Sequence, residues 1–245
     1  MKIGVFSDVH GNLEALQVCL ARLKEEKVEG YINCGDIIGY GPDSDACVQT
    51  IMTLPNVQNV MGNHDIIFID PRIESFFNFD AKIALDISKR EITDESMRFL
   101  SSIPIIIRAE NYTIVHGTPA DPVKEYFISA RQFYSNYSRW QGKICFVGHS
   151  HLAFYMEGTE KECNSYANKD KTFVLPLNTH KRYIINPGSV GKPRDNDPEI
   201  SFGVWDTEQE TFTFIREPYD FSITQRKMRE KGYPSFLIEG LERGL

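Results

Sequence analysis

Five short apolar runs in this chain each end in side chains that can bind a metal ion. These runs are KIGVF before Asp8 and His10, YINC before Asp36, NVQNVM before Asn63, His64 and Asp65, NYTIV before His116, and KICFV before His149 and His151. In an open α/β sheet, ligands bind at the edge formed by the carboxyl ends of the strands. The pattern therefore predicts a sheet that brings five distant chain segments to one site.

Histidine is concentrated at these predicted strand ends. The chain has 6 histidines, and only His180 lies elsewhere, in the polar segment LNTHKR, where we expect it at the surface. A single histidine at a strand end is more often a hydrogen-bonded structural residue than a ligand. Five histidines in the same predicted place favour a common metal-binding function instead.

The order of predicted elements in the first half of the chain indicates an α/β fold. Strands are expected over 2–7, 31–34 and 57–61, with helices over 13–26 and 42–54 between them. This alternation is typical of a largely parallel sheet with helical crossovers. Further helices are expected over 80–91, 94–102 and 130–138, and further strands over 103–108, 111–116 and 143–147.

From about residue 152 the pattern changes to short strands separated by turn residues, which is typical of an antiparallel meander. Strands are expected over 152–157, 172–177, 182–187, 201–207 and 211–217, an exposed loop over 157–171, and helices near 222–231 and 234–242. We expect the two halves of the chain to form the two sheets of one single domain, residues 1–245.

The chemistry of the candidate ligands restricts the metal. In extended backbone, residues i and i+2 point to the same side, so we expect Asp8 and His10 to reach one ion together with His151. His149 and His151 can then serve two neighbouring ions. Nitrogen and oxygen ligands without thiolates suit Mn, Fe, Zn, Ni or Co, whereas Mg and Ca sites rarely use so many histidines. There are more ligands than one tetrahedral ion needs, which favours two ions sharing a carboxylate, the arrangement used for in-line displacement at phosphorus.

Composition restricts the location and the partners. The formal net charge is −7, which disfavours stable binding of nucleic acid and of anionic membranes unless a bound metal supplies positive charge locally. The 5 cysteines are scattered, as expected for buried thiols in a reducing cytoplasm. The apolar runs are too short to span a membrane, and Met1 and Lys2 lead directly into a strand, without the pattern of a signal peptide.

The ordered motifs SDVHGN, GDIIGYGP, GNHD, VHG and GHSH, with NPGSVGKPRD at 186–195, resemble those of the calcineurin-like metallophosphoesterase superfamily. The GYGP ending and the NPGSVGKPR segment are similar to its small prokaryotic phosphodiesterase branch. The resemblance implies an α/β fold of four layers, an α/β/β/α sandwich with two facing mixed β-sheets.

The resemblance also implies a role for each motif residue. The first ion would be bound by Asp8, His10, Asp36 and His151, and the second by Asp36, as the bridge, with Asn63, His116 and His149. His64 would be the catalytic residue and not a ligand. The implied reaction is attack on phosphorus by a hydroxide held between the two metals, while His64 stabilises the developing charge or protonates the leaving oxygen.

One motif departs from the protein serine/threonine phosphatases of this superfamily. Those enzymes continue GDxxDRG, whereas this chain has Gly39 and Tyr40 in place of the second acid and the arginine. This departure disfavours phosphoprotein phosphatase activity. Arg194 is a candidate replacement for phosphate binding, because guanidinium suits phosphate; the alternative is a solvated arginine in a turn. Asn12 either contacts the substrate or caps the helix that begins at residue 13, and the cap is favoured.

A Phe-rich stretch, residues 66–79, follows the GNHD motif and contains Phe68, Phe76, Phe77 and Phe79. Ordinary packing is the favoured interpretation, and a lid that stacks on a nucleobase is the alternative. The sequence does not decide between them.

The predicted function is a dinuclear-metal phosphodiesterase that acts on a small phosphate ester, with nucleotides among the candidates and Mn as the first choice of metal. The alternatives are a dinucleoside polyphosphate hydrolase, a phosphomonoesterase, or a non-catalytic interaction scaffold on the same fold. A scaffold has no need to retain His64 together with all seven ligands, so an enzyme is favoured. The physiological substrate and the assembly into a homo-oligomer are left open.

Overall fold

The computed structural model describes residues 1–245, except for the side chain of Phe76. The strands are β1 (Lys2–Phe6), β2 (Gly30–Asn33), β3 (Val57–Asn59), β4 (Ile106–Arg108), β5 (Tyr112–Val115), β6 (Ile144–Phe146), β7 (Ala153–Gly158), β8 (Cys163–Ala167), β9 (Thr172–Pro176), β10 (Arg182–Pro187), β11 (Ile200–Asp206) and β12 (Thr211–Glu217). The helices are α1 (Leu13–Glu25), α2 (Ser44–Met52), α3 (Asn63–Ile66), α4 (Phe79–Glu91), α5 (Asp94–Ser102), α6 (Ala130–Asn136), α7 (Phe221–Glu230) and α8 (Ser235–Arg243), with a 3₁₀ helix, η1 (Pro71–Phe76).

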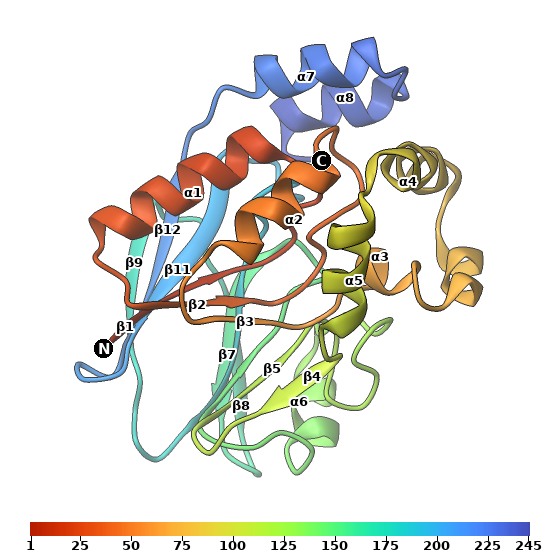
Figure 1. The fold of residues 1–245 in the computed structure, drawn as a ribbon. Helices are drawn as coiled ribbons and strands as arrows, with labels where there is room; N and C mark the ends of the chain where they lie inside the picture. Colours follow the sequence, from red (N-terminus) through yellow and green to blue (C-terminus); the bar gives the residue numbers. More distant parts are fainter.

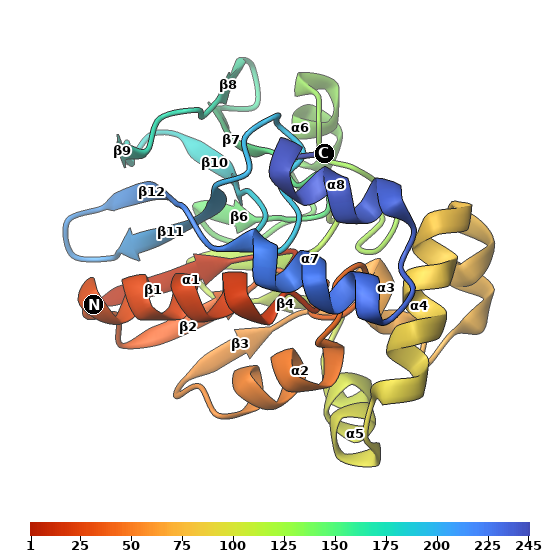
Figure 2. The same cartoon turned by 90° about the horizontal axis from the view of Figure 1, so that it is seen from above.

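The strands form two mixed six-stranded sheets that pack face to face. Their strand orders are β3-β2-β1-β11-β12-β9 and β4-β5-β6-β10-β7-β8. Helices α1, α2 and α7 cover the outer side of the first sheet, and α6 lies against the second (Figures 1 and 2). This arrangement confirms the predicted sandwich of two mixed sheets between helices.

Each sheet combines strands from both halves of the chain, so the expectation that each half forms its own sheet was wrong. Strand β1 pairs in parallel with β2 on one side and antiparallel with β11 on the other. In the second sheet, β10 pairs in parallel with β6 and antiparallel with β7. A central strand needs partners on both edges, and the C-terminal strands supply the second partner in both sheets.

The apolar residues of the strands explain how the two sheets are held together. Side chains from the inner faces, including Val5, Ile32, Phe146, Tyr183 and Phe212, form one buried core between the sheets. Such burial contributes roughly 1.5–3 kcal/mol for each large apolar side chain. The core fixes the two sheets relative to each other and so fixes the ends of the strands that carry the site.

Three elements were not predicted from the sequence. The expected loop over 157–171 contains β8, whose polar sequence CNSYA lacks apolar alternation because the strand lies at an exposed sheet edge. Helix α3 and helix η1 follow β3, where no helix was expected. Among the described residues, no helix combines the length and apolar character that a membrane-spanning segment needs.

Candidate metal centre

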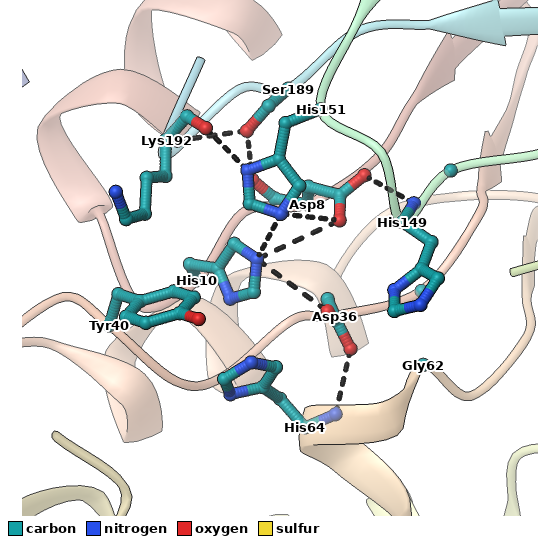
Figure 3. Close-up of polar contacts among 12 residues, drawn as sticks. Asp8, His10, Asp36, Tyr40, Gly62, His64, His149, His151, Ser189 and Lys192 are labelled. Carbon is teal, nitrogen blue, oxygen red and sulfur yellow. Dashed lines mark hydrogen bonds and ion pairs between the residues drawn. The ribbon is translucent and has the colours of Figure 1, made fainter. Parts of the chain in front are cut away.

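The polar residues that follow the core strands meet at one edge of the sandwich, as the strand-end pattern predicted. They come from the segments after β1, β2, β3, β5 and β6, and nearly all are buried (Figure 3). The structure brings together all seven predicted ligands: Asp8, His10, Asp36, Asn63, His116, His149 and His151.

The first group of candidate ligands consists of Asp8, His10, Asp36 and His151, each of which offers one atom within 4.8 Å of the others. His10 Nε2 lies 3.1 Å from His151 Nε2 and 3.5 Å from Asp36 Oδ2. His151 Nε2 lies 3.2 Å from Asp8 Oδ1. Four ligand atoms thus surround one point.

The second group consists of Asp36, His116 and His149. His116 Nε2 lies 3.3 Å from Asp36 Oδ2, 3.2 Å from His149 Nδ1 and 3.1 Å from Asn63 Oδ1. Asp36 belongs to both groups, which is the placement that a bridging carboxylate requires.

The hydrogen bonds of the four histidines show which ring nitrogens face the site as lone pairs. In each ring the other nitrogen contacts a main-chain carbonyl oxygen: that of Ile38 for His10, Cys34 for His116, Lys124 for His149 and Lys192 for His151. Because a carbonyl oxygen only accepts, the nitrogen beside it must be the donor in a neutral ring. When the rings are neutral, the remaining nitrogens therefore point lone pairs at one another.

Lone pairs that face each other at hydrogen-bond distance fit a cation. The Nε2 atoms of His10 and His151 cannot both be acceptors at 3.1 Å without a positive charge between them. Asp8 Oδ1 is also buried and has no hydrogen-bond partner in the described part of the chain. Histidine ligands that donate their other N–H to a carbonyl are typical of metal sites. The residues present thus fit a pair of divalent ions.

The pKa values of the histidines in the two ligand groups also fit a bound cation. Burial disfavours a charged imidazole, yet the Asp36 carboxylate raises the pKa of His116 to about 9. Burial and the positive charge of His116 lower the pKa of His149 to about 4, and burial lowers that of His151 well below its usual value. The Asp36 carboxylate thus attracts positive charge, which a divalent ion would supply, while burial keeps His149 and His151 neutral, as ligands must be.

The backbone that presents these ligands differs from the extended geometry expected for Asp8, His10 and their counterparts. Five residues have left-handed φ angles: Asp8 (54°), His10 (50°), Asp36 (57°), His149 (67°) and His151 (59°). Strand β1 ends at Phe6, and the chain turns before it reaches Asp8. Non-glycine residues rarely adopt this conformation, and such strain concentrates at functional sites. The strand ends therefore aim the ligands by turning and not by alternation.

His64 lies beside the ligand groups at the start of α3. Its main-chain N–H donates to Asp36 Oδ1 at 2.9 Å. Its ring packs against the rings of Tyr40 and Phe77, with centroid distances of 4.7 and 4.5 Å. The ring atom Nδ1 is buried without a hydrogen-bond partner among the described residues. Burial lowers the pKa of His64 well below its usual value, so the ring is neutral.

Gly39 leaves room for the His64 ring. The protein serine/threonine phosphatases named above have an acid at this position of the motif. The φ angle of Gly39 is 134°, and a Cβ atom at this position would lie 2.6 Å from His64 Nδ1 and 2.8 Å from His10 Nδ1. A side chain here would displace both imidazoles. His64 is therefore oriented by packing between Tyr40 and Phe77 and by its place at the start of α3, and not by a carboxylate at position 39.

A cavity of about 570 Å³, which we call the metal cavity, opens over both ligand groups. Its walls include Asp36, His64, His149, Phe77 and Arg194. Arg194, predicted as a phosphate-binding residue, is half-buried in this wall and donates from Nη2 to Tyr40 Oη at 3.3 Å. Its guanidinium is therefore held at the site by Tyr40, a residue of the GDIIGYG motif.

Two residues of the metal cavity were not predicted. Lys192 is buried, and burial with the nearby charge of Arg194 lowers its pKa to about 8. Its place in the same motif as Arg194 was a usable signal. Tyr126 stacks on His149 with ring centroids 3.9 Å apart and an angle of 6°. Tyr126 lies outside every motif, so the sequence carried no signal for it.

The interpretation of Asn12 as a cap is confirmed. Its Oδ1 accepts the N–H of Ala15, and its Nδ2 donates to Gly191 O and Tyr219 Oη, each at 2.9 Å. The side chain is 1% exposed and is not part of the metal cavity wall. The alternative of substrate contact is not supported by this placement, because its polar atoms are engaged within the protein.

The Phe-rich stretch divides between two environments. Phe68 packs against the core beneath α1 and α2, as packing predicts. Phe77 instead lines the metal cavity beside His64, and Phe79 is exposed. The side chain of Phe76 lies outside the described residues. Only part of the stretch is therefore positioned to face a substrate.

The fold agrees with comparisons against known proteins. Residues 1–210 match the family model described as calcineurin-like phosphoesterase superfamily domain. An uncharacterized protein of Methanocaldococcus jannaschii is 34% identical over 248 residues, which cover 99% of this chain and 98% of that protein.

Two solved structures are also similar. A metallophosphoesterase from Sphaerobacter thermophilus has 35% sequence identity and a TM-score of 0.88, covering 100% of this chain and 99% of that one. A novel archaeal phosphodiesterase has 17% identity and a TM-score of 0.50, covering 89% of this chain and 100% of that one, and so shares the fold.

Proposed function

The chain belongs to the calcineurin-like phosphoesterase superfamily, and we propose that it is a cytoplasmic, dinuclear-metal phosphodiesterase that hydrolyses a small phosphate ester. The observation that carries the proposal is the pair of ligand groups joined by Asp36, in which imidazole lone pairs face one another. The 5 cysteines are free thiols, which supports the reducing compartment.

Each of the two ligand groups described above is proposed to bind one ion. Asp8, His10, Asp36 and His151 would hold one ion, and Asp36, Asn63, His116 and His149 the other. When bound, the ions would activate a water molecule and neutralise phosphate oxygens. We propose Mn as the metal, with Fe, Zn, Ni and Co as the alternatives that the nitrogen and oxygen donors permit.

The residues of the chain supply binding and proton chemistry. Arg194 donates two parallel hydrogen bonds to phosphate oxygens, and Tyr40 keeps its guanidinium in place. His64 is neutral and retains one ring N–H, which donates to the leaving oxygen as negative charge develops there. In the overall reaction a water oxygen bonds to phosphorus, the bond to the leaving alcohol breaks, and one water proton ends on that alcohol.

The metal cavity supports a substrate larger than phosphate alone. Its volume of about 570 Å³ falls in the range of small-molecule sites, and its walls include the apolar side chains of Ile73, Phe77, Tyr126 and Leu237. Apolar walls beside a metal site fit an organic ester group. The buried, unpartnered ring of His64 supports an enzyme over a scaffold, because a binding surface gains nothing from it.

The test combines metal analysis with a substrate panel. Purified protein is loaded with Mn and assayed on bis-p-nitrophenyl phosphate, p-nitrophenyl phosphate, 2′,3′-cyclic nucleotides and diadenosine tetraphosphate. We expect turnover of the diesters and bound transition metal. Activity on the monoester alone would overturn the diesterase assignment, and activity on diadenosine tetraphosphate alone would replace it with the polyphosphate hydrolase. A protein without metal and without activity on any substrate would be a scaffold.

A further inference from the structure

A second hollow, which we call the side cavity, adjoins the metal cavity and has no part in the chemistry described above. It measures about 360 Å³, and its apolar wall is formed by Ile128, Leu152, Phe154 and Met156. Arg194 lines both cavities. Arg194 is therefore a wall residue common to the two hollows.

The side cavity begins at the residue next to a proposed metal ligand. Leu152 follows His151 directly, and β7 continues from Ala153 along the cavity wall. Because the side cavity adjoins the metal cavity, the structure favours part of the substrate itself as the group that binds in the side cavity.

The walls of the side cavity define the chemistry of that occupant. Ile128 and Leu152 are 63% and 37% exposed although both are apolar, and exposed apolar side chains gathered at one site mark a binding surface. Ser165 and Asn168 add neutral polar groups. The lining also includes Asp195, whose carboxylate is paired with Arg216, and the exposed Lys169. The apolar part of the wall suits an uncharged aryl or branched alkyl group.

The wall is held in place by a buried ion pair. Arg216 is 3% exposed; its Nη2 pairs with Asp195 and donates to Asn168 O at 3.2 Å. Asp195 neighbours Arg194 in the chain, and Asn168 lines the side cavity. The pair thus links the chain segment of Arg194 and Asp195 to the wall at Asn168.

The position of His64 indicates which half of a diester enters the side cavity. His64 and His151 lie on opposite sides of His10, with ring centroids 4.7 and 4.8 Å from it (Figure 3). The leaving alcohol belongs on the side of His64 and Phe77, within the metal cavity. Building on the proposed function, we propose that the side cavity binds the ester group that remains on phosphorus, so the substrate is a phosphodiester with an apolar retained alcohol.

The test compares two diesters with the same leaving group: phenyl p-nitrophenyl phosphate and methyl p-nitrophenyl phosphate. Release of p-nitrophenol is measured with the Mn-loaded protein. Burial of the retained phenyl ring predicts a kcat/KM about 30-fold higher for the phenyl ester. Ala167→Trp would fill the side cavity from β8 and reduce this preference to below about threefold. Ser165→Phe, on the same face of the strand, provides a second variant should the first fail to fold.

Asn164→Trp is the matched control. Asn164 is exposed on the opposite face of β8, so this variant keeps the full preference for the phenyl ester. Equal rates on both esters, or a preference that survives a folded Ala167→Trp or Ser165→Phe, would overturn the side-cavity assignment and leave the diesterase intact. Failure to hydrolyse either ester would instead overturn the proposed function.

Discussion

The Asp65 carboxylate accepts the main-chain N–H of Asp36 at 2.8 Å and thereby holds the residue that belongs to both candidate ligand groups. It also accepts the N–H groups of Ile37, Ile38 and Gly62 at 2.9, 3.2 and 3.0 Å. Asp65 is fully buried. One side chain therefore joins the loop after β2 to the turn that begins α3.

Replacing Asp65 with Asn is expected to destabilise both the fold and the metal centre. The amide has one acceptor oxygen, so its NH₂ group would face main-chain N–H groups that lose their acceptor. We expect a loss of about 2–4 kcal/mol in the free energy of unfolding and a lower metal content. Urea unfolding and elemental analysis measure the two effects. Asp70→Asn, at an exposed pair with Arg72, is the control, and equal stability of the two variants would contradict this role of Asp65.

The shared position of Asp36 predicts a difference between two ligand variants. Asp36 belongs to both ligand groups and His149 to the second alone. Asp36→Asn should therefore lower the occupancy of both ions, whereas His149→Ala should spare the ion held by Asp8, His10 and His151. Calorimetric titration of the metal-free proteins with Mn counts the sites. Loss of a single binding event in Asp36→Asn would argue against a bridge.

Gly39 should be essential for turnover because the His64 and His10 rings occupy the space of a Cβ atom. Gly39→Ala would push both imidazoles away, and displacement of a catalytic group by about 1 Å can cost on the order of a hundredfold in rate. The control is Gly232→Ala, where φ is also positive (75°) but nothing lies within 4 Å of the added atom. It should cost about 1–2 kcal/mol in stability and leave kcat unchanged. Similar kcat values for both variants would remove the steric argument.

The sequence predicted where the metal centre lies but not how the backbone builds it. Polar residues after β1 and β2 identified Asp8, His10 and Asp36, because the carboxyl ends of strands meet at one edge. Their left-handed φ angles escaped prediction because Asp and His adopt that conformation only occasionally and indicate it far less clearly than glycine does. These turns also depend on contacts with a neighbouring loop, which no local sequence pattern indicates. One such contact is the hydrogen bond from the main-chain N–H of His10 to Asp36 O, at 2.9 Å.

The pairing of the strands could not be predicted from local sequence patterns either, because it also depends on contacts between distant segments. The pairing of β1 with β11 joins residues about two hundred positions apart, such as Lys2 with Asp206. The strand patterns of the two halves predict the elements but not which edge each strand joins. Tyr126 also escaped prediction, because it lies outside every motif and meets His149 only in the folded chain.

His64→Ala should separate catalysis from metal binding. His64 contributes no atom to either ligand group, so we expect the metal content to stay at the parental value. Loss of a positioned imidazole should lower kcat on bis-p-nitrophenyl phosphate by about 10²–10⁴-fold. Kinetics and elemental analysis on one preparation test both statements. Parental turnover in a metal-loaded variant would exclude His64 from the reaction.

Lys227 predicts how stability depends on pH, because it joins α7 to the segments that carry α1 and α2. Its Nζ lies 2.5 Å from Glu14 Oε1 and 2.8 Å from Asp43 Oδ2. Burial opposes ionisation of Glu14, but hydrogen bonds from Lys227 and Thr224 lower its pKa below the usual value of 4.5. Because the folded pKa is the lower one, this stabilisation is present above about pH 4.5 and is lost as the pH falls through the folded value.

Lys227→Met should therefore lower the free energy of unfolding by about 1 kcal/mol at pH 7. The difference from the parent should be smaller at a pH low enough to protonate Glu14 in the folded parent. Urea unfolding at the two pH values measures it. Lys89→Met, which removes a more exposed partner of Glu74, should change stability less at pH 7. A difference that stays constant with pH would show that Lys227 acts through the packing of its methylene chain and not through its charge.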